Sequence, residues 1–136
     1  MKFEDFIKEG KVRRASKDPA LIKSLISAVK NDLLVLEKFK IDDNTKNIAM
    51  TNYYEVLRKT IEAIAISEGY KVYSHEAFTF FLKEKKDPIV AEKFDRFRII
   101  RNRINYEGKT ISKEESIENV SEIKKIIEAL KKKYLE

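Results

Sequence analysis

The sequence lacks cysteine and is poor in histidine, glycine and proline, with one, three and two copies. Without cysteine the chain can form neither a disulfide nor a thiolate site, and the single His75 cannot by itself build a zinc site or a two-histidine relay. We therefore expect no metal site and no cofactor. So few glycines and prolines leave little material for the turns of an all-β fold, whereas 38% charged residues suit long solvated helices. The composition predicts an all-α protein.

Long apolar runs are also absent. No stretch approaches the roughly 20 apolar residues that a membrane-spanning helix needs, so we expect a cytoplasmic protein without a membrane partner. The 136 residues fit one domain, 1–136, that buries roughly two-thirds of its unfolded surface. A formal charge of +6 permits a polyanionic partner, although many small basic proteins bind none. The abundance of lysine, glutamate and isoleucine matches the composition of many heat-adapted proteins.

Helix-start signals divide the chain into five main helices and a short N-terminal one. Asp-Pro pairs at Asp18 and Asp87 place a capping carboxylate before a proline suited to the first helical turn, and Ser112 forms a capping box with Glu115. Ser74 can cap another helix in the same way. Apolar residues at helical spacing then predict main helices at 20–39, 47–68, 75–85, 89–104 and 112–136. The expected fold is an antiparallel helical bundle with short connections.

Apolar residues also predict which helix faces are buried. The final helix places six of them at helical spacing, namely Ile117, Val120, Ile123, Ile127, Leu130 and Tyr134. Aromatic side chains concentrate at 78–81 and 94–97, and we expect a bundle of this size to have apolar surface left after one core is filled. The sequence therefore predicts a homodimer.

The segment 96–108, RFRIIRNRINYEG, contains four arginines and two asparagines. On a helix that turns 100° per residue, Arg96 and Arg103 fall opposite the apolar face, whereas Arg98, Arg101 and Asn105 fall along its edge. Arg101 should therefore be half buried. A guanidinium in that position needs a carboxylate, helix-end carbonyls or an external phosphate as its partner.

Structural roles for the same residues stay open. Arg101 lies in the last turns of its helix, where it can satisfy the negative end of the helix dipole. Asn102 and Asn105 can be C-terminal caps or turn residues before the Tyr-Glu-Gly. His75, in the first turn of its helix, is interpreted as a cap or a core-edge residue rather than as a catalyst.

Three segments, in this order, resemble the HEPN superfamily (higher eukaryotes and prokaryotes nucleotide-binding). They are IKEGKVRR before a capped helix, the central TNYYEVLRKTIEAIAISEGYKVYSHEAFTFFL, and FDRFRIIRNRINYEG before the last helix. The resemblance covers the chain from about Phe6 to Leu135 and implies a small up-and-down helical bundle that usually dimerises. In HEPN members that cleave RNA, an arginine is followed after four to six residues by a histidine.

Only the start of that RNase motif is present. Arg101-Asn102 matches it, but Tyr106 follows Arg101 after four residues and Asn105 follows Arg98 after six. Asparagine has no proton to exchange and tyrosine titrates near pH 10, so neither readily replaces a histidine that acts as general acid or base near neutral pH. No catalytic residue is therefore assigned, and we expect no RNA cleavage.

The leading hypothesis is a HEPN-like protein that binds a nucleotide or single-stranded RNA and dimerises with its arginine helices near the two-fold axis. The expected binding residues supply forked phosphate donors, amides for base or ribose edges, and a stacking ring. They are Arg98, Arg101, Asn102, Asn105 and Tyr106. The resemblance also implies a minimal nucleotidyltransferase as protein partner, in a toxin–antitoxin-like pair.

Two alternatives stay open beside this hypothesis. The first is a degenerate metal-independent endoribonuclease that keeps Arg101 and Asn102 as phosphate-stabilising groups and works without the histidine. The second is a purely structural dimer, in which the arginines cap helix ends and pair with acids such as Glu55 or Glu62. Affinity for phosphate separates this second alternative from the leading hypothesis.

Overall fold

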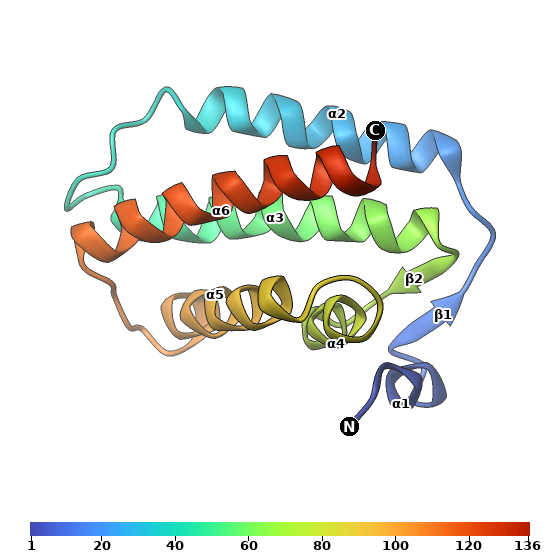
Figure 1. Cartoon of the computed structure of the whole chain (residues 1–136). Helices are drawn as coiled ribbons and strands as arrows, with labels where there is room; N and C mark the ends of the chain where they lie inside the picture. Colours follow the sequence, from blue (N-terminus) through green and yellow to red (C-terminus); the bar gives the residue numbers. More distant parts are fainter.

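Six helices and one two-stranded ribbon make up the fold, and the computed structural model describes all residues from Met1 to Glu136 (Figure 1). The elements are α1 (Phe3–Lys8), β1 (Val12–Arg14), α2 (Pro19–Leu36), α3 (Lys46–Ser67), β2 (Tyr70–Val72), α4 (His75–Lys85), α5 (Pro88–Tyr106) and α6 (Lys113–Tyr134). The all-α fold class is confirmed, and α2 to α6 correspond to the five predicted main helices. None of the helices is both long enough and apolar enough to cross a membrane.

Helix starts follow from the capping residues in the sequence. Asp87 accepts hydrogen bonds from the amides two and three residues ahead of it at 2.9 and 3.3 Å, so α5 begins at the next residue. Asp18 and Ser112 each accept a bond at 3.0 Å from an amide three residues ahead, at the starts of α2 and α6. Ser74 occupies the predicted cap position of α4, but its side chain makes no capping hydrogen bond.

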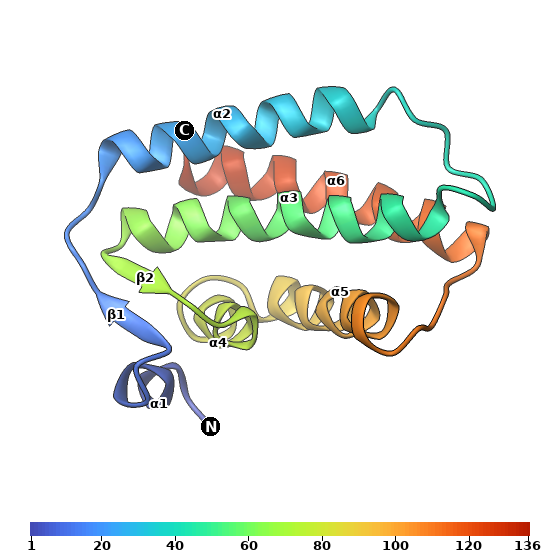
Figure 2. The same cartoon turned by 180° about the vertical axis from the view of Figure 1, so that it is seen from behind.

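Helix α3 lies at the centre of the molecule. Figures 1 and 2 show it between α2 on one side and the α4–α5 pair on the other, with α6 alongside. Its buried residues are Ala49, Met50, Tyr53, Tyr54, Val56, Leu57, Thr60, Ile61, Ala63, Ile64, Ala65 and Ile66. The hydrophobic core therefore surrounds α3, and side chains on this helix can reach every other layer.

The bundle is antiparallel between sequential partners but not throughout. Figure 1 shows α2 running against α3 and α5 against α6, while α3 and α6 run in the same direction. Ser116 at the start of α6 donates a hydrogen bond at 2.7 Å to the carbonyl of Lys46 at the start of α3. Further along both helices, the Lys124 ammonium lies 5.2 Å from the ring centre of Tyr53. The inserted α4–α5 pair brings α6 back to the end where α3 begins.

The ribbon formed by β1 and β2 is not among the predicted elements. Val12 pairs with Val72 in antiparallel register, and Val12 is only 1% exposed. Gly69, between α3 and β2, has a φ of +87°, and a β-carbon there would lie 3.1 Å from the carbonyl oxygen of Ala15. Only glycine adopts this conformation without strain. The ribbon attaches the N-terminal segment to the end of the bundle.

Apolar surface remains after folding, as predicted, but it does not lie on the two aromatic segments. Phe78, Phe81, Phe94 and Phe97 are at most 1% exposed, because helices of the same chain enclose them. Ile117, which the helical spacing predicted to be buried, is 46% exposed, because the neighbouring serine takes the inward position on α6 and bonds to α3. The exposed apolar side chains lie instead near the α2–α3 turn and on α5: Leu34, Val35, Phe39 and Ile48, and Ile89, Ile99 and Tyr106.

Candidate functional site

The last turns of α5 carry the arginine segment, and the predicted burial of its four arginines is confirmed. Arg96 and Arg103 are exposed, whereas Arg98 and Arg101 are partly buried. Arg96 pairs with Glu122 of α6 at 3.0 Å, at the surface of the bundle. The two partly buried arginines differ from each other in their partners.

Arg98 is bound to a carboxylate of its own helix. Its Nε and Nη2 donate to Asp95 Oδ1 at 2.9 and 2.8 Å, and the same oxygen accepts a hydrogen bond from Thr79 of α4 at 3.0 Å. Both residues line a groove of about 520 Å³ between α4 and α5, where Glu76 and Glu92 add two more carboxylates. Arg98 is therefore neutralised within the chain, in a groove that three carboxylates line together with Lys83.

Arg101 has aromatic and amide neighbours instead of a carboxylate. Its guanidinium carbon lies 5.5 Å from the ring centre of Tyr54 in α3 and 5.5 Å from that of Tyr106. Its Nη1 donates a hydrogen bond to Asn102 Oδ1 at 3.0 Å. Of the five predicted site residues, the structure thus brings Arg101, Asn102 and Tyr106 together, while Asn105 is exposed and makes no side-chain hydrogen bond.

The ion pairs of the whole chain set Arg101 apart. Four of the seven arginines pair with carboxylates, namely Arg14, Arg58, Arg96 and Arg98. Of the three unpaired arginines, Arg13 and Arg103 are exposed to solvent. Arg101 is the only arginine that is both partly buried and without a carboxylate partner. A guanidinium so placed keeps most of its five N–H donors for a ligand.

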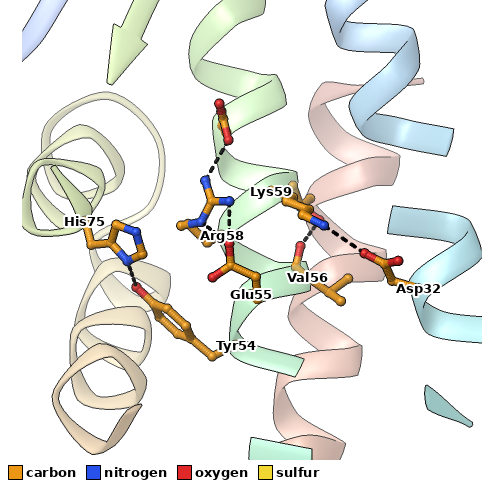
Figure 3. A network of polar contacts seen from close by, with 9 residues as sticks. Asp32, Tyr54, Glu55, Val56, Arg58, Lys59 and His75 are labelled. Carbon is orange, nitrogen blue, oxygen red and sulfur yellow. Dashed lines mark hydrogen bonds and ion pairs between the residues drawn. The ribbon is translucent and has the colours of Figure 1, made fainter. Parts of the chain in front are cut away.

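His75 belongs to the same site, which the sequence interpretation does not anticipate. Its Nδ1 and the hydroxyl of Tyr54 share a hydrogen bond of 2.9 Å, and Figure 3 shows the two rings meeting between α4 and α3. The Tyr54 ring is completely buried and stacks on Phe94 of α5 at 5.4 Å. Tyr54 therefore contacts His75 through its hydroxyl and Arg101 through its ring. The other ring nitrogen of His75 has no partner in the chain and is not enclosed.

Burial and nearby charge control the protonation of this site. Burial lowers the pKa of His75 below its ordinary value, and the positive charges of Arg58 and Arg101 lower it further. Burial raises the pKa of Tyr54 well above its ordinary value, so the phenol keeps its proton. At neutral pH the histidine is therefore uncharged beside a protonated tyrosine.

A second arginine, Arg58 of α3, is held by two carboxylates of the same helix. It donates to Glu55 Oε1 at 2.8 and 2.5 Å and to Glu62 Oε2 at 2.6 Å (Figure 3). Burial alone would raise the pKa of Glu55, but the hydrogen bond and charge of Arg58 outweigh it and lower the pKa. The structural alternative named Glu55 or Glu62 as partners of the arginines of α5, but here Arg58 pairs with both acids.

We call Tyr54, Arg58, His75 and Arg101 the arginine–tyrosine cluster. It joins three helices and holds one free guanidinium next to a neutral imidazole with an open nitrogen. Such a set can donate hydrogen bonds to an anion and can accept a proton. The ion pair of Arg58 with Glu55 could be predicted from the sequence, because residues three apart are neighbours on a helix. The contacts of Tyr54 with α4 and α5 could not, because helical periodicity describes one helix at a time.

The chain contains no group of three or more His, Asp or Glu side chains placed to hold a metal ion. Comparisons with protein-family models, with curated proteins and with solved structures found no match to this chain. The HEPN resemblance therefore stays a prediction from the residues quoted for it.

Proposed function

We propose that this protein is a HEPN-like binding protein whose arginine–tyrosine cluster takes the phosphate of a nucleotide or of single-stranded RNA. The observation that carries the proposal is that Arg101 is partly buried without a carboxylate partner. Burying a guanidinium costs free energy unless its donors are satisfied; Asn102 accepts from one N–H of Arg101, and phosphate oxygens match the donors that remain.

The surroundings of Arg101 suit a nucleotide more than free phosphate. Tyr106 is 72% exposed while one side of its ring contacts Arg101, so the ring offers a stacking surface next to the phosphate site. Asn102 orients the guanidinium and keeps amide hydrogens for a base or ribose edge. Arg98 contributes no free donor fork, because Asp95 occupies it and offsets its charge.

The proposal includes two partners that the resemblance implies. In a homodimer with the two α5 helices near the two-fold axis, two copies of Arg101 would line one cleft. A minimal nucleotidyltransferase would be the second partner, in a toxin–antitoxin-like pair. A neighbouring gene for such an enzyme, together with co-purification of the two proteins, would support this pairing, and co-expression without any complex would contradict it.

The direct test compares two arginines that carry the same charge. Arg101→Ala should weaken the binding of a fluorescently labelled short RNA and of ADP roughly tenfold, because it removes the partly buried donor. Arg103→Ala removes an exposed charge on the opposite side of α5 and should change affinity less than about twofold. Circular dichroism should show both variants folded. Equal losses would mean that diffuse positive charge alone attracts RNA and that the cluster is not the site.

A second candidate function is metal-independent RNA cleavage, which the position of His75 favours. The sequence motif lacks a histidine after Arg101, but His75 approaches the same cluster from α4 and bonds to Tyr54 at 2.9 Å. Its tautomer decides between the two functions. If Tyr54 donates to Nδ1, Nε2 carries the proton and can only donate to a phosphate; if Nδ1 donates to Tyr54, Nε2 is free to act as a base.

Two measurements separate cleavage from binding. Under the binding proposal, protein freed of contaminating nucleases leaves a labelled RNA intact. Nitrogen NMR should then show the neutral imidazole of His75 as the tautomer that carries its proton on Nε2. Cleavage that is lost in both His75→Ala and Arg101→Ala, and retained in Arg103→Ala, would instead establish the ribonuclease. Tyr106→His restores the spacing of the RNase motif, and we expect faint activity in that variant alone.

A further inference from the structure

The two-stranded ribbon has an outward face that is basic. Arg13 of β1 pairs directly with Lys71 of β2 in the antiparallel register. The neighbouring pair of valines points toward the core, and because side chains alternate along a strand, Arg13 and Lys71 point to the opposite, solvent side. Both are exposed.

The same face continues beyond the strands. The amide of Tyr73 donates to the carbonyl of Lys11 at 2.8 Å, which extends the register by one pair on the outward side. Tyr73 is 53% exposed. We call Lys11, Arg13, Lys71 and Tyr73 the basic ribbon face. Lys11 pairs with Glu9 at 3.2 Å, so Arg13 and Lys71 are its two unpaired cations.

The cation pair at its centre is unfavourable in the free protein. Like charges directly opposite each other on a ribbon destabilise it, and neither Arg13 nor Lys71 has a carboxylate partner. The inward side of the ribbon differs, because Arg14 pairs with Glu4 and lies 5.6 Å from the ring centre of Tyr70. Two exposed cations thus face each other on the outward side without a carboxylate, a charge arrangement that a polyanion would neutralise.

We propose that the basic ribbon face is a second contact surface for single-stranded RNA, continuous with the arginine–tyrosine cluster; this inference rests on the proposed function. Phosphates would lie between Arg13 and Lys71, and Tyr73 would stack on a base. Only Ser74 separates Tyr73 from His75, so their backbones lie within about 7 Å. One strand a few nucleotides long can therefore contact both surfaces. An acidic peptide could neutralise the lysines and arginine but would leave Tyr73 without a stacking partner.

The experiment compares a labelled oligouridylate of twelve nucleotides with a labelled uridine dinucleotide. In Arg13→Gln/Lys71→Gln, affinity for the oligonucleotide should fall about tenfold, and the salt dependence of log K should become shallower by about 1.4, since each phosphate contact on a single strand contributes about 0.7. Affinity for the dinucleotide should stay unchanged. The matched control Lys125→Gln/Lys132→Gln removes two exposed, unpaired charges from α6 and should change neither.

The stacking contact is tested separately. Tyr73→Ala should weaken oligonucleotide binding about five- to tenfold, whereas Tyr73→Phe keeps the ring and should bind like the parent. Polyglutamate should compete poorly. If polyglutamate competes as well as unlabelled RNA, and Tyr73→Ala binds the oligonucleotide normally, the basic ribbon face binds acidic peptides rather than RNA.

Lys71→Glu tests whether a loss of oligonucleotide affinity comes from a folding defect. It converts the repulsive pair into an attractive one, so it should raise the midpoint of thermal unfolding by about 1–3 °C while weakening oligonucleotide binding at least tenfold. Ribbon variants that bind the oligonucleotide like the parent, while Arg101→Ala does not, would overturn this inference and leave the proposed function standing. A parent protein that binds neither RNA would overturn both.

Discussion

At the scale of single residues, the neighbours of His75 decide its chemistry. A histidine exposed to water is partly protonated near pH 6.5. Here burial and the charges of Arg58 and Arg101 lower the pKa, so the folded chain holds the imidazole neutral between a protonated tyrosine and two guanidiniums. The half-buried position of Arg101 follows from the helical wheel of α5 alone. The position of His75 does not, because a wheel describes one helix and this contact joins two.

The lowered pKa of His75 predicts a pH dependence of stability. A group whose pKa is lower in the folded than in the unfolded chain binds protons more readily after unfolding, so its contribution is complete above about pH 6.5 and is lost as the pH falls through the folded pKa. The free energy of unfolding should therefore decrease between about pH 6.5 and 5. Urea titrations at half-unit pH steps measure this decrease.

His75→Gln provides the control for this effect, because it removes the only histidine in the chain. Three carboxyl groups also have lowered pKa values, namely those of Asp42, Glu55 and Glu122. Their protonation lowers the stability of the protein only at more acidic pH. The stability of His75→Gln should be nearly constant from pH 6.5 to 5. A parent protein equally constant there would show that His75 is not perturbed by the cluster.

At the scale of elements, the helices were predictable and the ribbon was not. Asp18, Asp87 and Ser112 mark helix starts through contacts within three residues, so the local sequence contains the whole signal. The ribbon pairs Val12 with Val72, and short three-residue strands carry too little pattern to identify a partner so distant in sequence. Of the candidate site, the sequence predicted only the part that lies on α5, namely Arg101, Asn102 and Tyr106, and not the residues that α3 and α4 contribute.

The cap of α5 gives a prediction at this scale. Asp87→Ala leaves two amides of the first turn without their acceptor, and it should lower the free energy of unfolding by about 1 kcal/mol. Asp87→Asn keeps an acceptor and should cost only a few tenths of that. Urea unfolding measures both. Because Arg101 lies at the other end of α5, RNA affinity should not change in either variant, and a parallel loss of affinity would contradict this separation.

At the scale of the whole molecule, the apolar surface left after folding differs from the predicted one. The aromatic clusters at 78–81 and 94–97 pack mainly against the chain's own core, since α3 offers burial on several sides. Composition reveals how much apolar material a chain has, but not whether one core is large enough to hold it. Two exposed groups remain as interface candidates, one near the α2–α3 turn and one on α5.

The homodimer prediction now becomes a choice between these two surfaces. A shared cleft with two copies of Arg101 requires contact through the side of α5 that carries Arg101. Tyr106 is exposed and lies against Arg101, so Tyr106→Glu should convert the dimer to a monomer and weaken RNA binding together. Phe39→Glu places the same charge at the α2–α3 turn and should leave the mass unchanged. Light scattering in moderate salt measures the mass. A parent that is monomeric at micromolar concentrations, or a dimer broken only by Phe39→Glu, would exclude the shared cleft.

The ribbon also has a consequence for folding and local opening. Its strands lie about sixty residues apart in sequence, with α2 and α3 between them, so closing it requires a long loop, whereas α2 and α3 meet through a short turn. We expect the helical hairpin to form first and the ribbon last. When the ribbon opens, Arg13 leaves with the N-terminal arm while Lys71 stays with the bundle. Bound RNA would bridge the two halves, so amide exchange at Ala15 and Tyr73 should slow when RNA is added.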